Sequence, residues 1–336
     1  MSDTIDLNGA TLDGAALESG KTYRNGSMRY VSAKKTEGVT LDGITIITGA
    51  KHGVDATGAK GFKALGCKLV SDGVPASGTF GIFFRNGQGC TVDRLVATSA
   101  RLAFVALNAT DIEIIDSDFS GCTEDAIRIA GCQRVGIRRC QMHDFATLEV
   151  GGNATHPDAI QVYGEEGNPC AEITIEDTLM FTGEGSIFQG IFVREYSNRP
   201  ATEGLYVRRN TVLCRMANGI TVSGTGEMVG NFVAGYIDDV VAQATVGGTW
   251  AGSLTADNQA QFWTDRGAGY QKGWAPEGNT IVDAVTAEQE AEIVADWRAQ
   301  FRPEPVILPE GLSPAVLAFL DERYNPATGS RVTVRR

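Results

Sequence analysis

Two aspartates, Asp125 and Asp158, each precede one copy of a short recurring pattern and are candidates for acid/base chemistry. The pattern is a small residue, an aliphatic residue, any residue and a second aliphatic residue. If its copies stack as parallel strands about 4.8 Å apart, the two carboxylates lie on adjacent coils, about 5 Å from each other. Like charges at this separation raise the pKa of one carboxyl group, which can then act as a general acid beside a base or nucleophile. A separation of about 5–5.5 Å is typical of retaining glycosidases, whereas a longer one suits inversion.

A structural role for the same aspartates is the alternative. A carboxylate before a strand can cap the turn by accepting hydrogen bonds from backbone N–H groups. Asp125, Asp158 and neighbouring carbonyl groups are also candidate calcium ligands, because calcium takes several oxygen ligands. The sequence contains no EF-hand, calcium-binding nonapeptide, zinc spacing, phosphate-binding loop or dinucleotide-binding glycine pattern. We therefore expect no resident cofactor, with calcium left open.

A third candidate catalytic residue is His156, two positions before Asp158. It ends a glycine-rich segment at about residues 143–157. A histidine can relay protons near neutral pH, so His156 is placed to assist either carboxyl group. The alternative is an exposed loop histidine with no role in the chemistry.

Polar and aromatic side chains are predicted on the outward side of the same strands. In the recurring pattern the two aliphatic residues point into the core, so the residue between them and those two positions away face outward. Aromatic faces beside polar groups suit a sugar, whose C–H faces stack while its hydroxyl groups form hydrogen bonds. With Phe83 as a flanking aromatic, the predicted substrate-binding residues are Arg128, Gln161, Tyr163, Phe192, Arg194 and Glu195.

Arg128 has two interpretations. It can clamp the carboxylate of a uronate or sialate through two hydrogen bonds. In a β-eliminating lyase this neutralises the carboxylate and acidifies the C5–H, and Tyr163 or His156 then takes the proton. Alternatively, Arg128 forms a salt bridge with Asp125 or Asp158. The residues alone leave elimination, hydrolysis and a structural role open.

The elements that must position these residues recur at a regular interval. The interval has a base of 22 to 23 residues plus insertions, and the first strand of each repeat begins at Val39, Phe62, Cys90, Ile112, Val135, Ile173 and Leu205. A fixed period of this size is typical of a solenoid. A repeat of this length holds two or three short strands, and parallel stacking pairs each strand with its copy one coil away. The prediction is an all-β fold, a parallel β-helix.

The chain is predicted to begin with capping coils and to continue as the β-helix. Residues 1–50, where Asx-Gly pairs recur every 17 residues, are expected to close the open end of the stack. Residues 51–285 form the β-helix, with an aromatic-rich insertion at residues 244–277. The insertion interrupts a recurring asparagine turn, seen at Asn210, Asn231 and Asn279. Its aromatic residues, expected to pack on the solenoid or on a neighbouring subunit, are Trp250, Phe262, Trp263, Tyr270 and Trp274.

A short α-helical tail at residues 286–336 is predicted to follow. Thr286 and Gln289 form a capping box before the helical run Ala287–Arg298. A second helix is expected at Ala315–Arg323. The tail is interpreted as a C-terminal cap or an attachment arm.

Composition excludes several classes of protein. A net charge of −12 and a pI near 4.8 argue against a protein that tracks a nucleic-acid backbone. The sequence has no apolar run approaching about 18 residues, so no membrane insertion is expected. Its first residues lack the basic start and apolar core of a signal peptide. The seven cysteines, odd in number and without CxxC spacing, predict small buried side chains and synthesis in a reducing compartment.

The recurring pattern resembles a known fold family. Copies such as Gly190-Ile191-Phe192-Val193, together with the Asx-Gly turns, resemble the right-handed parallel β-helix of the pectin-lyase-like superfamily over roughly residues 5–285. Within this superfamily the chain resembles especially bacteriophage tailspikes and polysaccharide depolymerases. The H-x-D-x-x-Q string at residues 156–161 is similar to segments of phage and bacterial β-helix proteins.

The resemblance implies a protein that binds, and cleaves by acid/base chemistry, a surface polysaccharide. It also implies a homotrimer in a virion tail or spike, made in the host cytoplasm and attached to other virion proteins through a terminus. Because this fold carries many activities, a non-catalytic structural or adhesive virion protein is the alternative. A bacterial cell-surface lyase or epimerase is a third interpretation.

Overall fold

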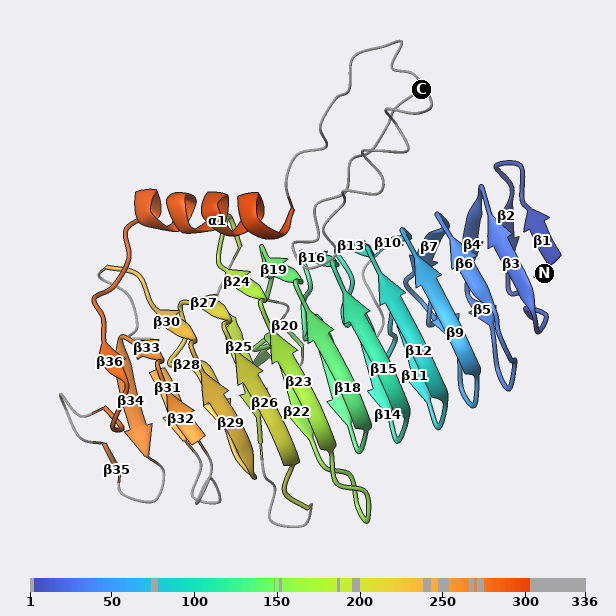
Figure 1. Ribbon diagram of the computed structural model, residues 1–336. Helices are drawn as coiled ribbons and strands as arrows, with labels where there is room; N and C mark the ends of the chain where they lie inside the picture. Colours follow the sequence, from blue (N-terminus) through green and yellow to red (C-terminus); the bar gives the residue numbers. More distant parts are fainter. Residues whose placement is uncertain are drawn as a thin grey trace, which may run out of the picture. The chain divides into compact units, whose positions relative to one another are not determined.

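The described chain winds through three long parallel β-sheets, and successive coils add one strand to each sheet (Figure 1). The computed structural model describes residues 3–73, 78–147, 149–150, 153–185, 188–194, 200–237, 243–246, 254–265, 269–270 and 275–302. The chain divides into two compact units, Met1–Val285 and Thr286–Arg336. The division of the chain expected from the sequence at residue 50 stays a prediction.

Within those described ranges, sheets A, B and C contain 11, 12 and 11 strands. Sheet A consists of β1 (Asp3–Asp6), β3 (Lys21–Arg24), β6 (Thr40–Asp42), β9 (Lys60–Leu65), β12 (Gln88–Asp93), β15 (Thr110–Ile115), β18 (Gln133–Arg138), β23 (Ala171–Glu176), β26 (Glu203–Arg208), β29 (Gly226–Val229) and β32 (Leu254–Ala256). Sheet B consists of β2 (Thr11–Asp13), β4 (Ser27–Arg29), β7 (Thr45–Thr48), β10 (Lys68–Ser71), β13 (Val96–Thr98), β16 (Asp118–Ser120), β19 (Gln141–His143), β24 (Leu179–Phe181), β27 (Thr211–Leu213), β30 (Phe232–Ala234), β33 (Gln259–Ala260) and β36 (Thr280–Ile281).

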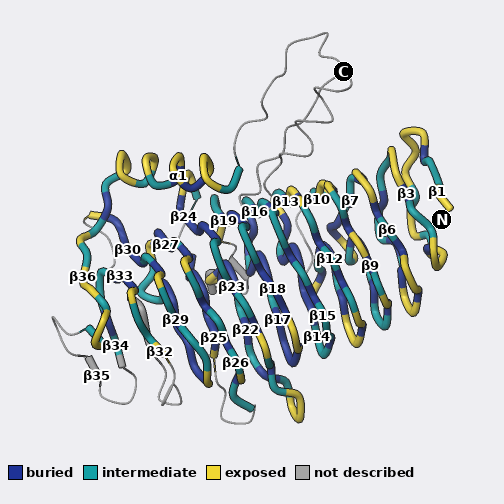
Figure 2. Tube along the Cα trace, in the orientation of Figure 1, coloured by how far each residue is buried: buried dark blue, intermediate teal, exposed yellow. Residues whose placement is uncertain are grey.

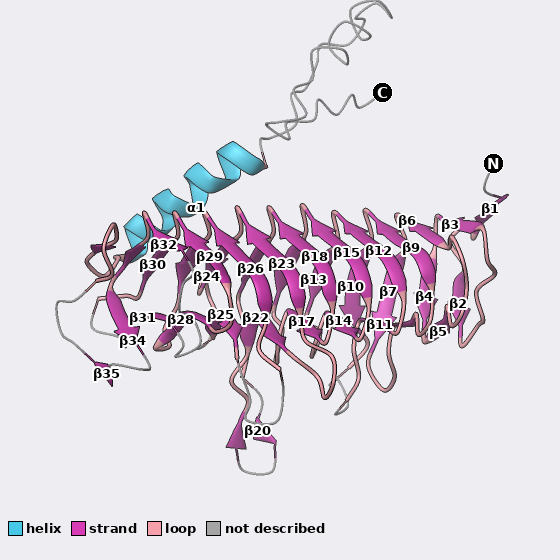
Figure 3. Cartoon of the chain, turned by 60° about the horizontal axis from the view of Figure 1, so that its bottom comes forward, coloured by secondary structure: helices cyan, strands magenta, loops and turns pink. Residues whose placement is uncertain are grey.

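Sheet C carries the outward positions that the sequence singles out. It consists of β5 (Val31–Ser32), β8 (Val54–Asp55), β11 (Ile82–Arg85), β14 (Phe104–Leu107), β17 (Ile127–Ala130), β22 (Asp158–Tyr163), β25 (Gln189–Val193), β28 (Asn218–Val222), β31 (Gln243–Val246), β34 (Phe262–Asp265) and β35 (Gly269–Tyr270). Only β35 pairs antiparallel within the described part of this sheet. A small hairpin of β20 (Glu149–Val150) and β21 (Asn153–Ala154) projects from the coils beside β22 (Figure 3).

The register of sheet A confirms the predicted parallel β-helix. Cys90 pairs with Phe62 on one side and with Ile112 on the other, and Ile112 pairs with Val135. Val135 then pairs with Ile173 across the longest predicted interval, so the extra residues there leave the stack as an insertion. The alternation of aliphatic and polar residues within each strand therefore becomes columns of like side chains along the stack.

The small residue that opens each copy of the pattern has a steric cause. At Gly190, at the start of β25, a Cβ atom would lie 2.1 Å from the carbonyl oxygen of Gly219 on the next coil. The backbones approach so closely at Gly190 that any residue with a Cβ atom, alanine included, would force a shift. The two aliphatic residues that follow, such as Ile191 and Val193, are fully buried in the core.

The core runs along the inside of the coils (Figure 2) and contains all seven cysteines. Each cysteine is a free thiol and is buried, as the sequence predicts. Burial raises the pKa of Cys67 and of Cys170 to about 11, so neither thiol is ionised near neutral pH.

A ladder of asparagines, buried except for the half-buried Asn279, lines the turn between sheets A and B near the C-terminal end of the stack. Asn210 Nδ2 donates to Asn231 Oδ1 at 2.9 Å, Asn231 Nδ2 donates to Asn258 Oδ1 at 2.7 Å, and Asn258 Nδ2 donates to Asn279 Oδ1 at 2.8 Å. The recurring asparagine turn predicted from the sequence is confirmed, and Asn258 is a member that the sequence reasoning missed.

The prediction that residues 244–277 interrupt the coils is wrong for the parts that the structure describes. There, β32 pairs with β29, β33 with β30 and β34 with β31, so these residues form a further coil. Trp263 is fully buried and its indole N–H donates to the carbonyl oxygen of Thr280 at 3.1 Å, which confirms packing on the solenoid for this residue. Trp250, Trp274 and the side chain of Tyr270 lie outside the described residues.

The second unit contains the helix α1 (Ala287–Phe301). Thr286 and Gln289 form the predicted capping box, each side chain accepting from the other's backbone N–H. The helix predicted at Ala315–Arg323 lies outside the described residues. No helix in the described residues is long and apolar enough to cross a membrane.

Candidate functional site

The predicted carboxylates meet where β17 and β22 lie side by side in sheet C. Register pairs Arg128 with Gln161, and Asp125 and Asp158 occupy equivalent positions before these two residues. The N–H of Asp158 donates to Asp125 Oδ1 at 3.2 Å, and the N–H of Ala126 donates to the carbonyl oxygen of Asp158. The two aspartates, hereafter the Asp125–Asp158 pair, are therefore on adjacent coils, as the sequence predicts.

Asp125 is held by a cation and a backbone donor. Arg128 Nε donates to Asp125 Oδ2 at 2.7 Å, while Asp125 itself is 2% exposed. Burial raises the pKa of Asp125, and the charge and hydrogen bond of Arg128 oppose that rise. Of the two carboxyl groups, Asp125 is thus the one that the surroundings favour in its ionised form.

Asp158 has a different environment. It is 1% exposed, and one oxygen, Oδ2, accepts from Gln161 Nε2 at 2.8 Å. The other oxygen, Oδ1, is buried and has no hydrogen-bond partner within the described chain. Burial, and next the charge of Asp125, raise the pKa of Asp158 well above its ordinary value. Of the two carboxyl groups, Asp158 is therefore the one that its surroundings favour in the protonated form.

The sequence left open whether Arg128 binds substrate or forms a salt bridge, and the structure shows the salt bridge to Asp125. The guanidinium also lies 3.9 Å from Glu124, which pairs with Arg101 one coil away. These two residues were missed by the sequence reasoning, although Arg101 and Glu124 are 23 residues apart, which is one coil. The Arg128 side chain remains 26% exposed, so its outer edge is accessible from solvent.

The other predicted binding residues are only partly brought together. Tyr163 is half-buried on β22, two residues beyond Gln161. Phe192 pairs with Gln161 in register but is 8% exposed, so its ring does not offer the open stacking face that was expected. Strand alternation fixes the direction of a side chain and not what covers it. Arg194, just after β25, is exposed.

The two remaining predicted site residues are His156 and Glu195. His156 is exposed in the segment between the β20–β21 hairpin and β22, and a role for it in catalysis stays a prediction. Glu195 lies outside the described residues. No group of three or more His, Cys, Asp or Glu side chains in the described ranges is positioned to hold a metal ion. Calcium binding stays untested.

A second histidine, His143 at the end of β19, lies in sheet B and has well-defined partners. Its Nδ1 is 2.6 Å from Asp144 Oδ2, its Nε2 is 3.1 Å from Asp118 Oδ1, and its ring stacks on Phe181. Burial lowers the pKa of His143, but hydrogen bonds and charges from Asp118 and Asp144 outweigh burial and raise it overall.

The raised pKa of His143 predicts a pH-dependent contribution to stability. The contribution is fully present below the unfolded-state pKa of about 6.5 and is lost as the pH rises through the folded-state pKa. We expect His143→Gln to lower the free energy of unfolding by roughly 1 kcal/mol at pH 6 and by less at pH 8.5. Denaturant titrations at both pH values test this, with the exposed His156→Gln as the matched control. An equal loss at both pH values would contradict a charged His143.

Comparisons with known proteins agree with this fold. The family model described as "Right handed beta helix region" matches residues 31–235. PfbA, a surface adhesin of Streptococcus pneumoniae, is 11% identical, with a TM-score of 0.51 over 88% of this chain and 75% of that chain. The Dettilon tailspike protein is 12% identical, with a TM-score of 0.37 over 85% of this chain and 60% of its own. No curated protein matches the sequence significantly. Likenesses of such low identity show the fold alone.

Proposed function

We propose that this chain, which belongs to the right-handed β-helix family, binds a surface polysaccharide on the outer face of sheet C and cleaves it at the Asp125–Asp158 pair. The observation that carries the proposal is the asymmetry of the pair. One carboxyl group is bonded to Arg128, and the other has a buried oxygen without a partner in the described chain. Two neighbouring carboxyl groups in unlike environments are the usual arrangement for acid/base cleavage of a glycosidic bond.

The environments assign the roles. Asp158, kept neutral by burial and by its neighbour, donates its proton to the oxygen of the leaving sugar as the glycosidic bond breaks. Asp125, whose ionised form Arg128 favours, bonds to the anomeric carbon as the leaving oxygen departs. Water then gives a proton to Asp158, and its oxygen displaces Asp125 from the anomeric carbon. Gln161 orients Asp158 through its 2.8 Å hydrogen bond. The second displacement returns Asp158 to its protonated form and Asp125 to its carboxylate form.

A specific observation favours a second candidate function, adhesion without cleavage. Asp125 and Asp158 are 2% and 1% exposed, so a substrate contacts their carboxyl groups only if neighbouring side chains move. An adhesive protein needs no such movement, because the half-buried side chains of sheet C are enough for binding. In this case Asp125 has the capping role that the sequence also allowed, since it accepts the N–H of Asp158.

The biological setting that we propose follows the resemblance to tailspikes. The chain is then a virion tail or spike protein, a homotrimer joined to other virion proteins through one terminus. The molecular mass of the purified protein in solution tests the trimer directly. A monomer at micromolar concentration would remove this part of the proposal and leave the glycan site unaffected.

Incubation of the protein with a panel of acidic surface polysaccharides tests the proposed function. We expect new reducing ends without the ultraviolet absorbance of an unsaturated sugar, because the Asp125–Asp158 pair supports hydrolysis. Reducing ends accompanied by that absorbance would replace hydrolysis by elimination, with Arg128 neutralising a uronate and Tyr163 or His156 taking the C5 proton. Binding to a polysaccharide that stays intact would establish the adhesive alternative.

A further inference from the structure

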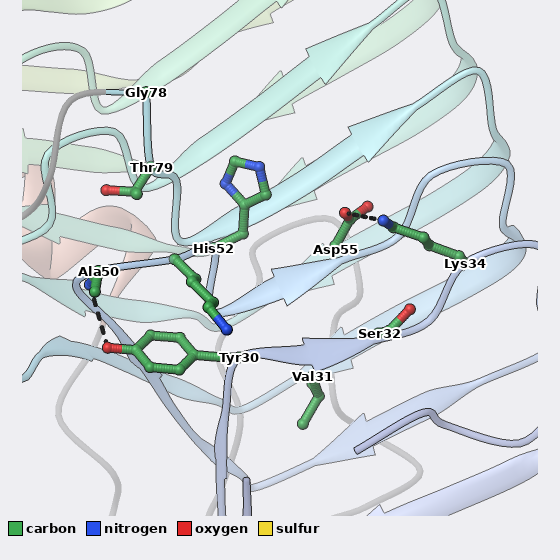
Figure 4. Close-up of a pocket in the computed structure, with 10 residues that line it drawn as sticks. Tyr30, Val31, Ser32, Lys34, Ala50, His52, Asp55, Gly78 and Thr79 are labelled. Carbon is green, nitrogen blue, oxygen red and sulfur yellow. Dashed lines mark hydrogen bonds and ion pairs between the residues drawn. The ribbon is translucent and has the colours of Figure 1, made fainter. Parts of the chain in front are cut away.

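A second pocket lies on the sheet C side of the stack near its N-terminal end (Figure 4). It is open to solvent, has a volume of about 380 Å³ and is lined by Tyr30, Ser32, Lys34, Lys51, His52 and Thr79, among others. We call it the Tyr30–His52 pocket. Its volume falls in the range of small-molecule sites and exceeds what a single inorganic anion needs.

Two aromatic rings border this pocket, and both are held in place by other groups. The His52 ring stacks on Phe80, with centroids 4.8 Å apart and an interplanar angle of 12°, and it also lies 4.8 Å from the Phe83 ring. The Tyr30 hydroxyl donates to Asp72 at 3.0 Å and accepts from the N–H of Ala50 at 3.2 Å. Rings fixed before a ligand arrives lose little conformational entropy on binding.

The backbone at Tyr30 fixes the position of its ring. Tyr30 has a φ of +57°, in the left-handed region that bulky side chains rarely adopt. This conformation costs roughly 1–2 kcal/mol relative to the right-handed region. It places the phenol where both the Ala50 N–H and the Asp72 carboxylate reach its hydroxyl group.

The polar groups of the pocket are mainly donors. The N–H of Phe80 donates to His52 Nδ1 at 3.1 Å, so the neutral imidazole carries its proton on Nε2. Burial lowers the pKa of His52, which keeps the imidazole in this neutral form near neutral pH. Lys51 Nζ lies 6.0 Å from the centroid of the Tyr30 ring. The hydroxyl groups of Ser32 and Thr79 complete the lining.

The carboxylates beside the pocket already accept hydrogen bonds from other protein groups. Asp55 accepts from Thr57 Oγ1 at 2.7 Å and pairs with Lys34 at 3.0 Å. Asp72 accepts from Tyr30 and lies 3.9 Å from the guanidinium of Arg29. Lys34 balances the charge of Asp55, whereas Arg29 is shared between Asp72 and Asp13. Lys51 and the His52 Nε2–H remain as donors for a negatively charged group.

We propose that the Tyr30–His52 pocket binds a carboxylate-bearing sugar of an acidic glycan. The apolar C–H face of the sugar packs on an aromatic ring, which buries apolar surface, while Lys51 and the His52 Nε2–H donate to the carboxylate. The pocket and the Asp125–Asp158 pair share the outer face of sheet C, where β8, β11, β14 and β17 are consecutive strands. Three strand spacings separate Asp55 from Arg128, which is about 14 Å. Binding in this pocket does not require cleavage at the pair.

The three histidines of the chain allow a direct test by NMR, because only His52 lines this pocket among them. Titration with trigalacturonate should shift the imidazole signals of His52 saturably and leave those of His143 unchanged. Lys51→Glu should weaken this binding by about tenfold, since it replaces a donor cation by an anion. Lys68→Glu, at an exposed lysine of sheet B, is the matched control and should bind like the wild type.

Three results would overturn the proposal. They are unchanged His52 signals at millimolar trigalacturonate, equal affinity for the fully methyl-esterified trisaccharide, and equal affinity in Lys51→Glu with an unchanged melting curve. The same titration with Asp158→Asn separates this site from the proposed cleavage, because His52 should respond as in the wild type. A protein that cleaves no polysaccharide but still binds through His52 would refute only the cleavage.

Discussion

An Asp158→Asn variant should release reducing ends from its polysaccharide at least about 100-fold more slowly than the wild type, with an unchanged or higher melting temperature. The amide oxygen of asparagine can still accept from Gln161, so the hydrogen bond that positions this side chain is kept. An amide has no carboxylic proton to give to the leaving oxygen, so general-acid catalysis is lost. Removing a buried carboxyl group that Asp125 repels also removes a source of instability at neutral pH.

The pH dependence of the wild-type rate adds a second readout. Since the pKa of Asp158 is raised, the general acid is present below that pKa and is lost as the pH rises through it. Asp111→Asn is the matched control, because Asp111 pairs with Arg134 on sheet A and should leave the rate unchanged. Unaltered cleavage by Asp158→Asn would refute the assigned role. A loss of about 1 kcal/mol of stability without any change in rate would instead assign Asp158 to the turn.

Truncation of the asparagine ladder should give the largest loss of stability. We expect Asn231→Ala to lower the free energy of unfolding by about 3 kcal/mol, measured by denaturant titration. Asn231 Oδ1 accepts from both the backbone N–H and the Nδ2 of Asn210, and Asn231 Nδ2 donates to the carbonyl oxygen of Val207. Alanine leaves these buried groups without partners, and each unsatisfied group costs about 1–3 kcal/mol.

The control for the ladder is Asn168→Ala, at an exposed asparagine just before β23. This variant should change the free energy of unfolding by less than about 0.5 kcal/mol. Equal losses for Asn231→Ala and Asn168→Ala would mean that the ladder contributes nothing beyond ordinary surface asparagines. A loss in Asn231→Ala that is matched by Asn258→Ala would support the ladder as a continuous unit.

The coils could be predicted from the sequence because their determinants are local. Alternation of aliphatic and polar residues sets which side chains point inward, and the recurrence of Cys90, Ile112 and Val135 sets the coil length. At residues 244–277 the aliphatic pattern weakens, and the prediction failed there. Asn258 was the available signal, since it lies between Asn231 and Asn279 at intervals close to one coil.

The candidate site could be predicted only as a set of neighbours. Register follows from the repeat, so the adjacency of Asp125 and Asp158 was foreseeable. The degree of burial of Phe192 and of the two carboxyl groups was not, because strand alternation sets the direction of a side chain and not how much of it is covered. The ion pair between Arg128 and Asp125 depends on side-chain rotamers, which the spacing of residues in the sequence does not specify.

The regular stacking of the coils sets fixed distances between binding positions on the outer face of sheet C. Because consecutive strands keep a fixed spacing, the Tyr30–His52 pocket and the Asp125–Asp158 pair are a whole number of coils apart. A short oligosaccharide can occupy one of the two positions, whereas a polymer can occupy both. In the polymer the second contact is intramolecular and gains from a high effective concentration. A β-helix with this arrangement would distinguish its ligands by chain length as well as by chemical composition.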